Sequence, residues 1–359
     1  MKFVLVIFFI CFAEAAKIIS KRDIIDDSID NNAAIEVTLT SADFEDLHNV
    51  HEIDLKSIGI NVLEDPTAGN YSEGDININN LKTFAENANG YARNAIKSRY
   101  RNILLRKWPN NEIPYTLSSK YGSYAKSMIA KAMDEYHRKT CIKFIARDIR
   151  KHNDYVYIHP DDGCYSLVGK VGGNIVGKQP LSLDSGCIQV GTIVHELMHT
   201  VGFFHEQSRN DRDKYIKIVW ENVMNGADDQ FEKYGINVID HLNEPYDYAS
   251  IMHYGPYAFS ANGKKTITPS QNGADKMGQR VQFSEIDLRK INKLYDCKGS
   301  FSGNSVLETT NNNNNNQVRN SGILETSTET PLRSLISTAK SKIRSKLNFH
   351  FSRWGPFNA

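Results

Sequence analysis

The chain has 359 residues, and its 43 Lys and Arg residues balance its 42 Asp and Glu residues to leave a formal net charge of +1. This length allows one domain with a large core, or two domains. A chain so close to neutral lacks the positive field of proteins built to bind nucleic acid, so we exclude nucleic acid as a partner.

Residues 1–16 have the pattern of a secretory signal peptide. Lys2 precedes an apolar run from Phe3 to Phe12, and Ala13-Glu14-Ala15 follows as an A-x-A cleavage pattern. This run is too short to span a bilayer, for which about twenty residues are needed, although an uncleaved anchor is the alternative. No later stretch is apolar enough for a transmembrane segment. We therefore expect a secreted, extracellular protein.

Residues 17–93 are acidic and polar, and we interpret them as a propeptide. The pair Asp26-Asp27 and the stretch from Asp43 to Asp54 carry much of the negative charge. Asn70-Tyr71-Ser72 is an N-glycosylation sequon, which makes Asn70 a candidate glycan site. Gly74-Asp75 follows directly, and by composition alone this pair predicts a surface turn.

Residues 94–299 mix strand and helix patterns. Alternating apolar residues predict strands over 113–117, 143–145 and 155–159. The glycine-rich run over 169–177 does not follow the strand–helix pattern of a phosphate-binding loop, so it predicts a turn and no nucleotide site.

Three helices are predicted in the same region. The first runs over 124–140, and its apolar residues recur at helical spacing, which predicts a core-facing side: Met128, Ala132, Met133 and Tyr136. The second covers 192–201. The third covers 284–295, with Ser284 as its N-cap.

The most informative run lies in and after the second predicted helix. It reads H-E-x-x-H-x-x-G-x-x-H, from His195 to His205. His195 and His199 are four residues apart, so on a helix both imidazoles leave the same face and can bind one zinc ion. Gly202 permits a left-handed turn out of the helix, after which His205 can return as a third ligand. Glu196 is placed to reach a zinc-bound water.

Three neutral imidazoles leave one coordination position open, as catalytic zinc sites do. The alternative is that these are three satisfied core histidines. The full spacing would arise by chance in roughly one chain in tens of thousands, so the zinc interpretation is favoured. Other histidines lack ligand spacing and are expected to be ordinary surface or core residues: His137, His152, His159 and His241.

Five cysteines are present, and Cys11 belongs to the signal peptide. An even number of cysteines in a secreted chain predicts two disulfides, with three possible connectivities. A zinc–thiolate site is the alternative. The four remaining residues are Cys141, Cys164, Cys187 and Cys297.

Residues 300–359 differ in composition from the rest. Asn311–Asn316 is a homopolymer typical of a disordered spacer. Pro331–Ala359 contains six Lys and Arg residues and no acidic residue, with apolar residues at helical spacing. This basic tail could bind an acidic surface such as lipid or matrix polysaccharide, although a solvated, disordered tail is the favoured alternative.

The zinc run and its surroundings resemble the astacin family of zinc metalloendopeptidases, within the metzincins. The run continues as Glu206-Gln207-Ser208-Arg209-Asn210-Asp211-Arg212, and Ser250-Ile251-Met252-His253-Tyr254 follows later. The resemblance extends from Trp108 to Cys297. It implies an α+β fold, a metzincin-type two-lobed domain with a long active-site helix and a Met-turn. It also implies the short form of the family, with a propeptide and without EGF or CUB modules.

The resemblance assigns the active-site residues. One Zn²⁺ per chain would be held by His195, His199 and His205. Glu196 would move the proton between the attacking water and the leaving amine. Tyr254 would be a further zinc ligand that swings away to support the transition state.

The resemblance also describes a zymogen. Asp75 would bind zinc in place of the catalytic water, although Ser72 stands where the family motif has Phe. A trypsin-like protease would cut at Arg93, with Arg99-Tyr100-Arg101 and Arg106-Lys107 as alternative sites. Glu206 would meet the new N-terminus. The implied disulfides are Cys141–Cys297 and Cys164–Cys187.

The sequence therefore predicts a secreted, zymogen-activated zinc endopeptidase that hydrolyses proteins, with matrix, hatching or digestive substrates. One rival is a catalytically silent zinc fold that acts as a binding module. Glu196 and Tyr254 favour the enzyme over this rival. A second rival makes the basic tail the working part, delivered to a surface by the protease domain.

Overall fold

The computed structural model describes residues 19–30, 33–45, 47, 50–60, 69–77, 105–171, 177–234 and 240–298. The predicted signal peptide, the maturation site at Arg93 and the tail over 300–359 lie outside these residues. None of the helices in the described part of the chain is long and apolar enough to cross a membrane.

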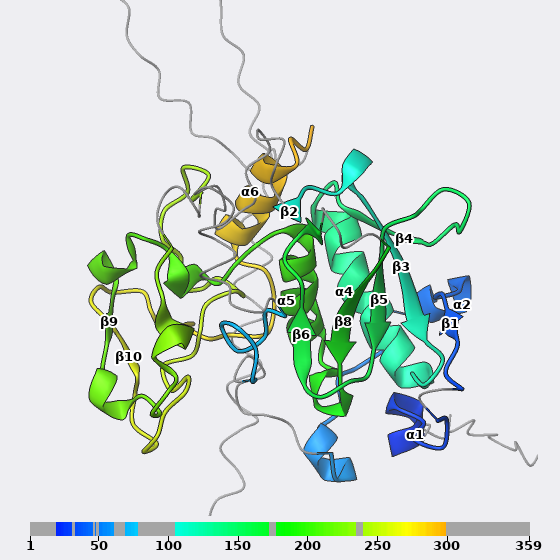
Figure 1. Ribbon diagram of the computed structural model, residues 1–359, viewed down its shortest axis with the longest axis horizontal. Helices are drawn as coiled ribbons and strands as arrows, with labels where there is room; N and C mark the ends of the chain where they lie inside the picture. The colour runs from blue at the N-terminus through cyan, green and yellow to red at the C-terminus, as the bar shows by residue number, and fades with distance from the viewer. Residues whose placement is uncertain are drawn as a thin grey trace, which may run out of the picture. The chain divides into compact units, whose positions relative to one another are not determined.

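A mixed sheet of six strands forms the main framework (Figure 1). Its order is β1-β3-β5-β8-β6, and β4 pairs with the first half of β3. The pairs β3–β4, β3–β5 and β5–β8 are parallel, whereas β1–β3 and β6–β8 are antiparallel. The strands are β1 (Glu36–Val37), β3 (Glu112–Ser118), β4 (Lys143–Ala146), β5 (Tyr155–His159), β6 (Cys164–Ser166) and β8 (Lys178–Leu183).

The three predicted strands are confirmed as β3, β4 and β5. The glycine-rich run predicted as a turn includes a short strand that the sequence analysis missed. This strand, β7 (Lys170–Val171), pairs antiparallel with β2 (Leu105–Arg106). Two residues are too few for an alternating pattern, so nothing in the sequence signals this pair.

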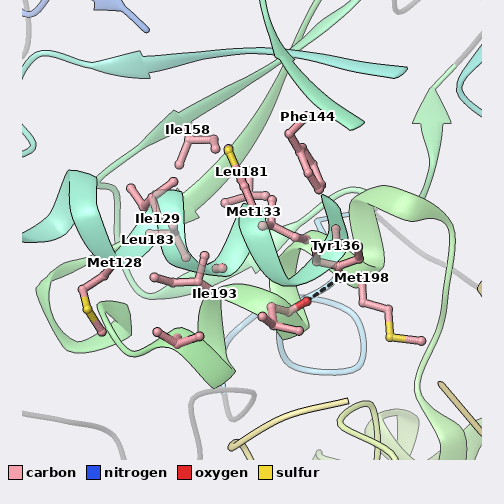
Figure 2. Close-up of a cluster of buried hydrophobic side chains, with 14 of the residues drawn as sticks. Met128, Ile129, Met133, Tyr136, Phe144, Ile158, Leu181, Leu183, Ile193 and Met198 are labelled. Carbon is pink, nitrogen blue, oxygen red and sulfur yellow. Dashed lines mark hydrogen bonds between the residues drawn. The ribbon is translucent and has the colours of Figure 1, made fainter. Parts of the chain in front are cut away.

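Helices α4 (Ser123–Lys139) and α5 (Val190–Val201) pack on each other beside the sheet. The apolar residues predicted to face the core from α4 are all buried. The Tyr136 hydroxyl donates to the carbonyl oxygen of Val194 at 2.7 Å, which joins the two helices. Figure 2 shows side chains of α4 meeting Ile158 and Leu181 from the sheet and Ile193 from α5.

The chain after α5 builds a second lobe with its own core. Strands β9 (Ile216–Ile218) and β10 (Ile267–Pro269) form an antiparallel pair there, set apart from the main sheet in Figure 1. A separate apolar cluster includes Phe231, Tyr254 and Ile267. These two cores, the first of which includes the buried side chains of α5, form the two-lobed α+β fold that the resemblance implied.

Helix α6 (Glu285–Leu294) ends the domain, and Ser284 is its N-cap as predicted. The Ser284 hydroxyl accepts the Asp287 N–H at 2.8 Å, and the Asp287 carboxylate accepts the Ser284 N–H at 3.0 Å. These reciprocal bonds form a capping box. Two disulfides are present, Cys141–Cys297 across 156 residues and Cys164–Cys187 across 23.

The described part of the predicted propeptide lies along the catalytic domain. It contains α1 (Lys21–Ile24) and α2 (Ser41–Phe44), which pack on α4, and β1, which adds to the second half of β3. Glu52 accepts the N–H of Val190 at 2.8 Å, at the first residue of α5. This helix begins two residues before the predicted Thr192, and the Glu52 carboxylate satisfies its first N–H.

Candidate metal centre and active site

Helix α5 presents two imidazoles on one face, because His195 and His199 are one turn apart. The helix ends at Gly202, whose φ of 125° lies in a region that side chains disfavour. The Gly202 N–H is bonded to the carbonyl oxygen of His199 at 2.8 Å, which closes the last turn. His205 follows and returns toward the helix, with its ring centroid 4.8 Å from that of His199.

The three imidazoles converge on one carboxylate. The Nε2 atoms of His195 and His205 lie 3.0 and 3.3 Å from Oδ2 of Asp75. His199 Nε2 lies 3.3 Å from Oδ1 of the same group. All four side chains are buried, and their potential ligand atoms lie within 4.8 Å of one another. Residues distant in the sequence thus form one cluster of the size of a metal site.

The other ring nitrogen of each histidine has an acceptor. His195 Nδ1 lies 2.7 Å from the carbonyl oxygen of Ile251, and His199 Nδ1 lies 2.7 Å from that of Phe203. His205 Nδ1 lies 2.7 Å from Oε2 of Glu73. An acceptor at Nδ1 selects the tautomer with the proton there, so each Nε2 lone pair points at the cluster centre.

The donor set fits zinc. Three neutral imidazoles and one carboxylate are nitrogen and oxygen ligands that zinc takes in tetrahedral geometry. Among the described residues, His199 Nε2 and Asp75 Oδ1 are buried without a hydrogen-bond partner. Buried polar atoms of this kind need a partner, and a cation at the centre of the cluster supplies one.

Glu196 is fully buried beside this cluster. Neither of its carboxylate oxygens has a hydrogen-bond partner among the described residues. Burial, and next the negative charge of Asp75, raise the pKa of the Glu196 carboxyl well above its usual range. A buried carboxyl group next to a metal site can exchange protons with a water molecule there.

The Tyr254 ring stacks obliquely on His205, with centroids 4.7 Å apart. Its hydroxyl donates to the carbonyl oxygen of Glu73 at 2.5 Å. Tyr254 therefore lies beside the metal ligand His205, and its hydroxyl is bonded to Glu73.

The Met-turn, residues 250–254, contacts His195 and is held by α6. Asp287 accepts the Ser250 hydroxyl at 2.6 Å and the Ile251 N–H at 2.9 Å. The carbonyl oxygen of Ile251 in turn meets His195, and Met252 is buried. Asp287 is a supporting residue that the sequence analysis missed, although Ser284 and Asp287 have capping-box spacing.

Glu206 lies in a buried ionic cluster. Its carboxylate accepts from Lys290 Nζ at 2.5 Å, from Arg209 at 3.0 Å and from the Asp247 N–H at 3.0 Å. Burial would raise the pKa of Glu206, but the charges of Lys290 and Arg209 lower it to about 2. Arg209 also pairs with Asp211 at 2.9 Å, which extends the ionic cluster. Lys290 had no recognisable signal in the sequence.

The site combines a helix that carries two imidazoles, a third imidazole after a glycine turn, and an adjacent glutamate. This combination defines a zinc metalloendopeptidase. The comparisons with known proteins agree. The model of the astacin peptidase family matches residues 100–296. The chain therefore belongs to the astacin family.

Among its relatives, zinc metalloproteinase nas-4 of Caenorhabditis elegans is 65% identical over 291 residues, covering 81% of this chain and 88% of that protein. Zinc metalloproteinase nas-13 of the same organism is 48% identical over 269 residues, covering 73% of this chain and 57% of that protein. A similar solved structure is high choriolytic enzyme 1, a hatching enzyme zinc-protease from the medaka fish Oryzias latipes. It has 40% identity and a TM-score of 0.51, and the match covers 57% of this chain and 100% of that one.

Proposed function

We propose that this protein is a secreted endopeptidase that is made as a latent precursor and hydrolyses extracellular proteins. The observation that carries the proposal of latency is the position of Asp75. Its fully buried carboxylate lies 3.0 to 3.3 Å from the Nε2 atoms of His195, His199 and His205. A carboxylate there occupies the position that a water molecule and a substrate carbonyl need.

In the mature enzyme, His195, His199 and His205 hold zinc, which supplies a Lewis acid for the activation of water and of the scissile carbonyl. Glu196 takes the proton of the attacking water and delivers it to the leaving amine. The Tyr254 hydroxyl donates to the oxygen on which negative charge develops.

Release of the propeptide requires a cut between Asp75 and the catalytic domain. We propose Arg93 as the site for a trypsin-like protease, so that residues 94–299 form the mature domain. The new N-terminus would then meet the Glu206 cluster.

Three further assignments complete the proposal. Asn70 is exposed, as a glycosylated side chain must be. Residues 1–16 would direct secretion. An acidic surface is the candidate partner of the basic tail over 331–359.

Hydrolysis by the uncut precursor tests the assignment of Asp75. The intact precursor should not cleave a fluorogenic peptide, whereas the D75A precursor should cleave it before any processing. D26A is the matched control, because Asp26 is a propeptide carboxylate that bonds Ser28, far along the chain from the histidines. Mass spectrometry verifies that each sample is uncut. A D75A precursor as silent as the parent would show that Asp75 does not maintain latency.

A further inference from the structure

Glu73 is the second buried carboxylate that the propeptide brings to the metal centre. It lies in a tight turn in which the N–H of Tyr71 and the carbonyl oxygen of Gly74 are bonded, with 3.2 Å between nitrogen and oxygen. Its side chain is 1% exposed, and its backbone has a φ of 47°. A positive φ is unfavourable for a residue with a side chain, so the contacts of Glu73 must compensate for this conformation.

Two groups of the active site bond Glu73, the His205 imidazole and the Tyr254 hydroxyl. Carboxylate oxygen Oε2 lies 2.7 Å from His205 Nδ1 and 3.4 Å from the backbone nitrogen of His205. The carbonyl oxygen of Glu73 accepts the hydroxyl of Tyr254. One propeptide residue thus meets a zinc ligand with its side chain and the predicted oxyanion donor with its backbone.

The acceptors at the three Nδ1 atoms differ in origin and charge. His195 and His199 bond backbone carbonyl oxygens of the catalytic domain, those of Ile251 and Phe203. His205 bonds a carboxylate of the propeptide, that of Glu73. A carboxylate at Nδ1 orients the imidazole and makes Nε2 a stronger donor to metal, and loss of such a partner usually weakens metal binding by about 10–100-fold.

We propose that Glu73 is a positioning residue for the zinc ligand His205, and that it makes the precursor hold zinc more tightly than the matured enzyme does. The inference rests on the proposed latent precursor, because Glu73 departs with the propeptide. Asp75 would block the metal directly, whereas Glu73 would act through His205. The same short turn would then both silence the enzyme and retain its metal during folding and export.

Zinc release from the full precursor tests this role. The zinc-loaded parent, E73Q and E73A are mixed with an excess of a colorimetric chelator, and the release rate is recorded. E73Q keeps the volume of the side chain and removes its charge, so release should be about 10–100 times faster than from the parent. E36Q is the matched control, because Glu36 is also a propeptide glutamate but bonds Thr116 and Lys178, away from the histidines. Its release rate should equal that of the parent.

Cobalt provides a second readout that a purely structural role would not change. The visible spectrum of Co²⁺-loaded precursor should differ between the parent and E73Q, because the orientation of His205 changes. The E36Q spectrum should match the parent. Once the propeptide has been removed, the parent, E73Q and E36Q proteins are identical in sequence, so their release rates should coincide and exceed that of the parent precursor.

Equal zinc release from the E73Q and parent precursors would overturn the inference. So would matured proteins that retain zinc as long as the parent precursor does. The latency assignment would fail on a different result, namely a D75A precursor that does not cleave the peptide. The two hypotheses can therefore fail independently.

Discussion

The hydroxyl of Tyr254 is a single group whose removal tests the proposed peptide hydrolysis with little effect on the fold. In this structure it donates to the carbonyl oxygen of Glu73, a residue of the proposed propeptide. The ring stays against His205 and packs edge-on to Phe231, so loss of the hydroxyl should not disturb the fold.

Y254F in the matured enzyme should therefore lower kcat about a hundredfold to a thousandfold, the usual cost of one oxyanion donor, with little change in KM. Steady-state hydrolysis of a peptide measures both constants, and zinc content should stay at the parent value. Y248F is the control, because the Tyr248 hydroxyl donates to the carbonyl oxygen of Tyr215. An unchanged kcat in Y254F would make Tyr254 a packing residue only.

At the residue scale, the predictable site residues were those whose positions follow from the spacing of a local motif. His195, His199 and His205 were predictable because helix geometry and one glycine turn bring them together. Glu73 and Lys290 were not predictable, because their partners are far away in the chain and no local spacing marks them. Their roles depend on the tertiary path of the propeptide and on the position of α6.

At the element scale, Asp287 links α6 to the Met-turn. Its carboxylate caps the helix at Ser284 and also bonds Ser250 and Ile251. This carboxylate is fully buried, and burial together with the charge of Asp247 raises its pKa from 3.8 to about 6. The folded state favours the protonated Asp287 carboxyl. Asp287 therefore contributes its full stabilisation at a pH below its unfolded pKa. This stabilisation is lost as the pH rises through the folded pKa of about 6.

D287N cannot ionise and should lack this pH dependence. The free energy of unfolding of the parent minus that of D287N should therefore fall by about 2.5 kcal/mol between about pH 4 and pH 7. Denaturant unfolding at several pH values, with the disulfides intact, measures this difference. Curves that remain parallel over that interval would show that Asp287 does not titrate as described.

The elements themselves were largely predictable from local pattern. The amphipathic spacing of α4 and the cap of α6 are local signals, and both helices lie within a residue of their predicted ends. The start of α5 was less predictable, because Glu52 satisfies its first N–H from a distant part of the chain. The two-residue strands β1, β2 and β7 carry no local pattern, and only their tertiary partners define them.

At the scale of the whole molecule, the fold followed from family resemblance and not from periodicity. Strand order, and the mixture of parallel and antiparallel pairs, depend on contacts between distant segments. The disulfide pairing had three possibilities by counting alone, and the structure joins Cys141 to Cys297 and Cys164 to Cys187. The path of the proposed propeptide over β3, α5 and the metal centre had no signal beyond the Gly74-Asp75 pair.

The central claim is that zinc and Glu196 together perform peptide hydrolysis in this chain. The most direct test is to measure zinc content and protein hydrolysis together in the matured parent and in E196A. The substitution removes a buried carboxylate without removing a metal ligand, so both proteins should contain about one zinc per chain. Hydrolysis by E196A should fall at least about a hundredfold. An E196A enzyme that keeps its zinc and hydrolyses at the parent rate would contradict the account.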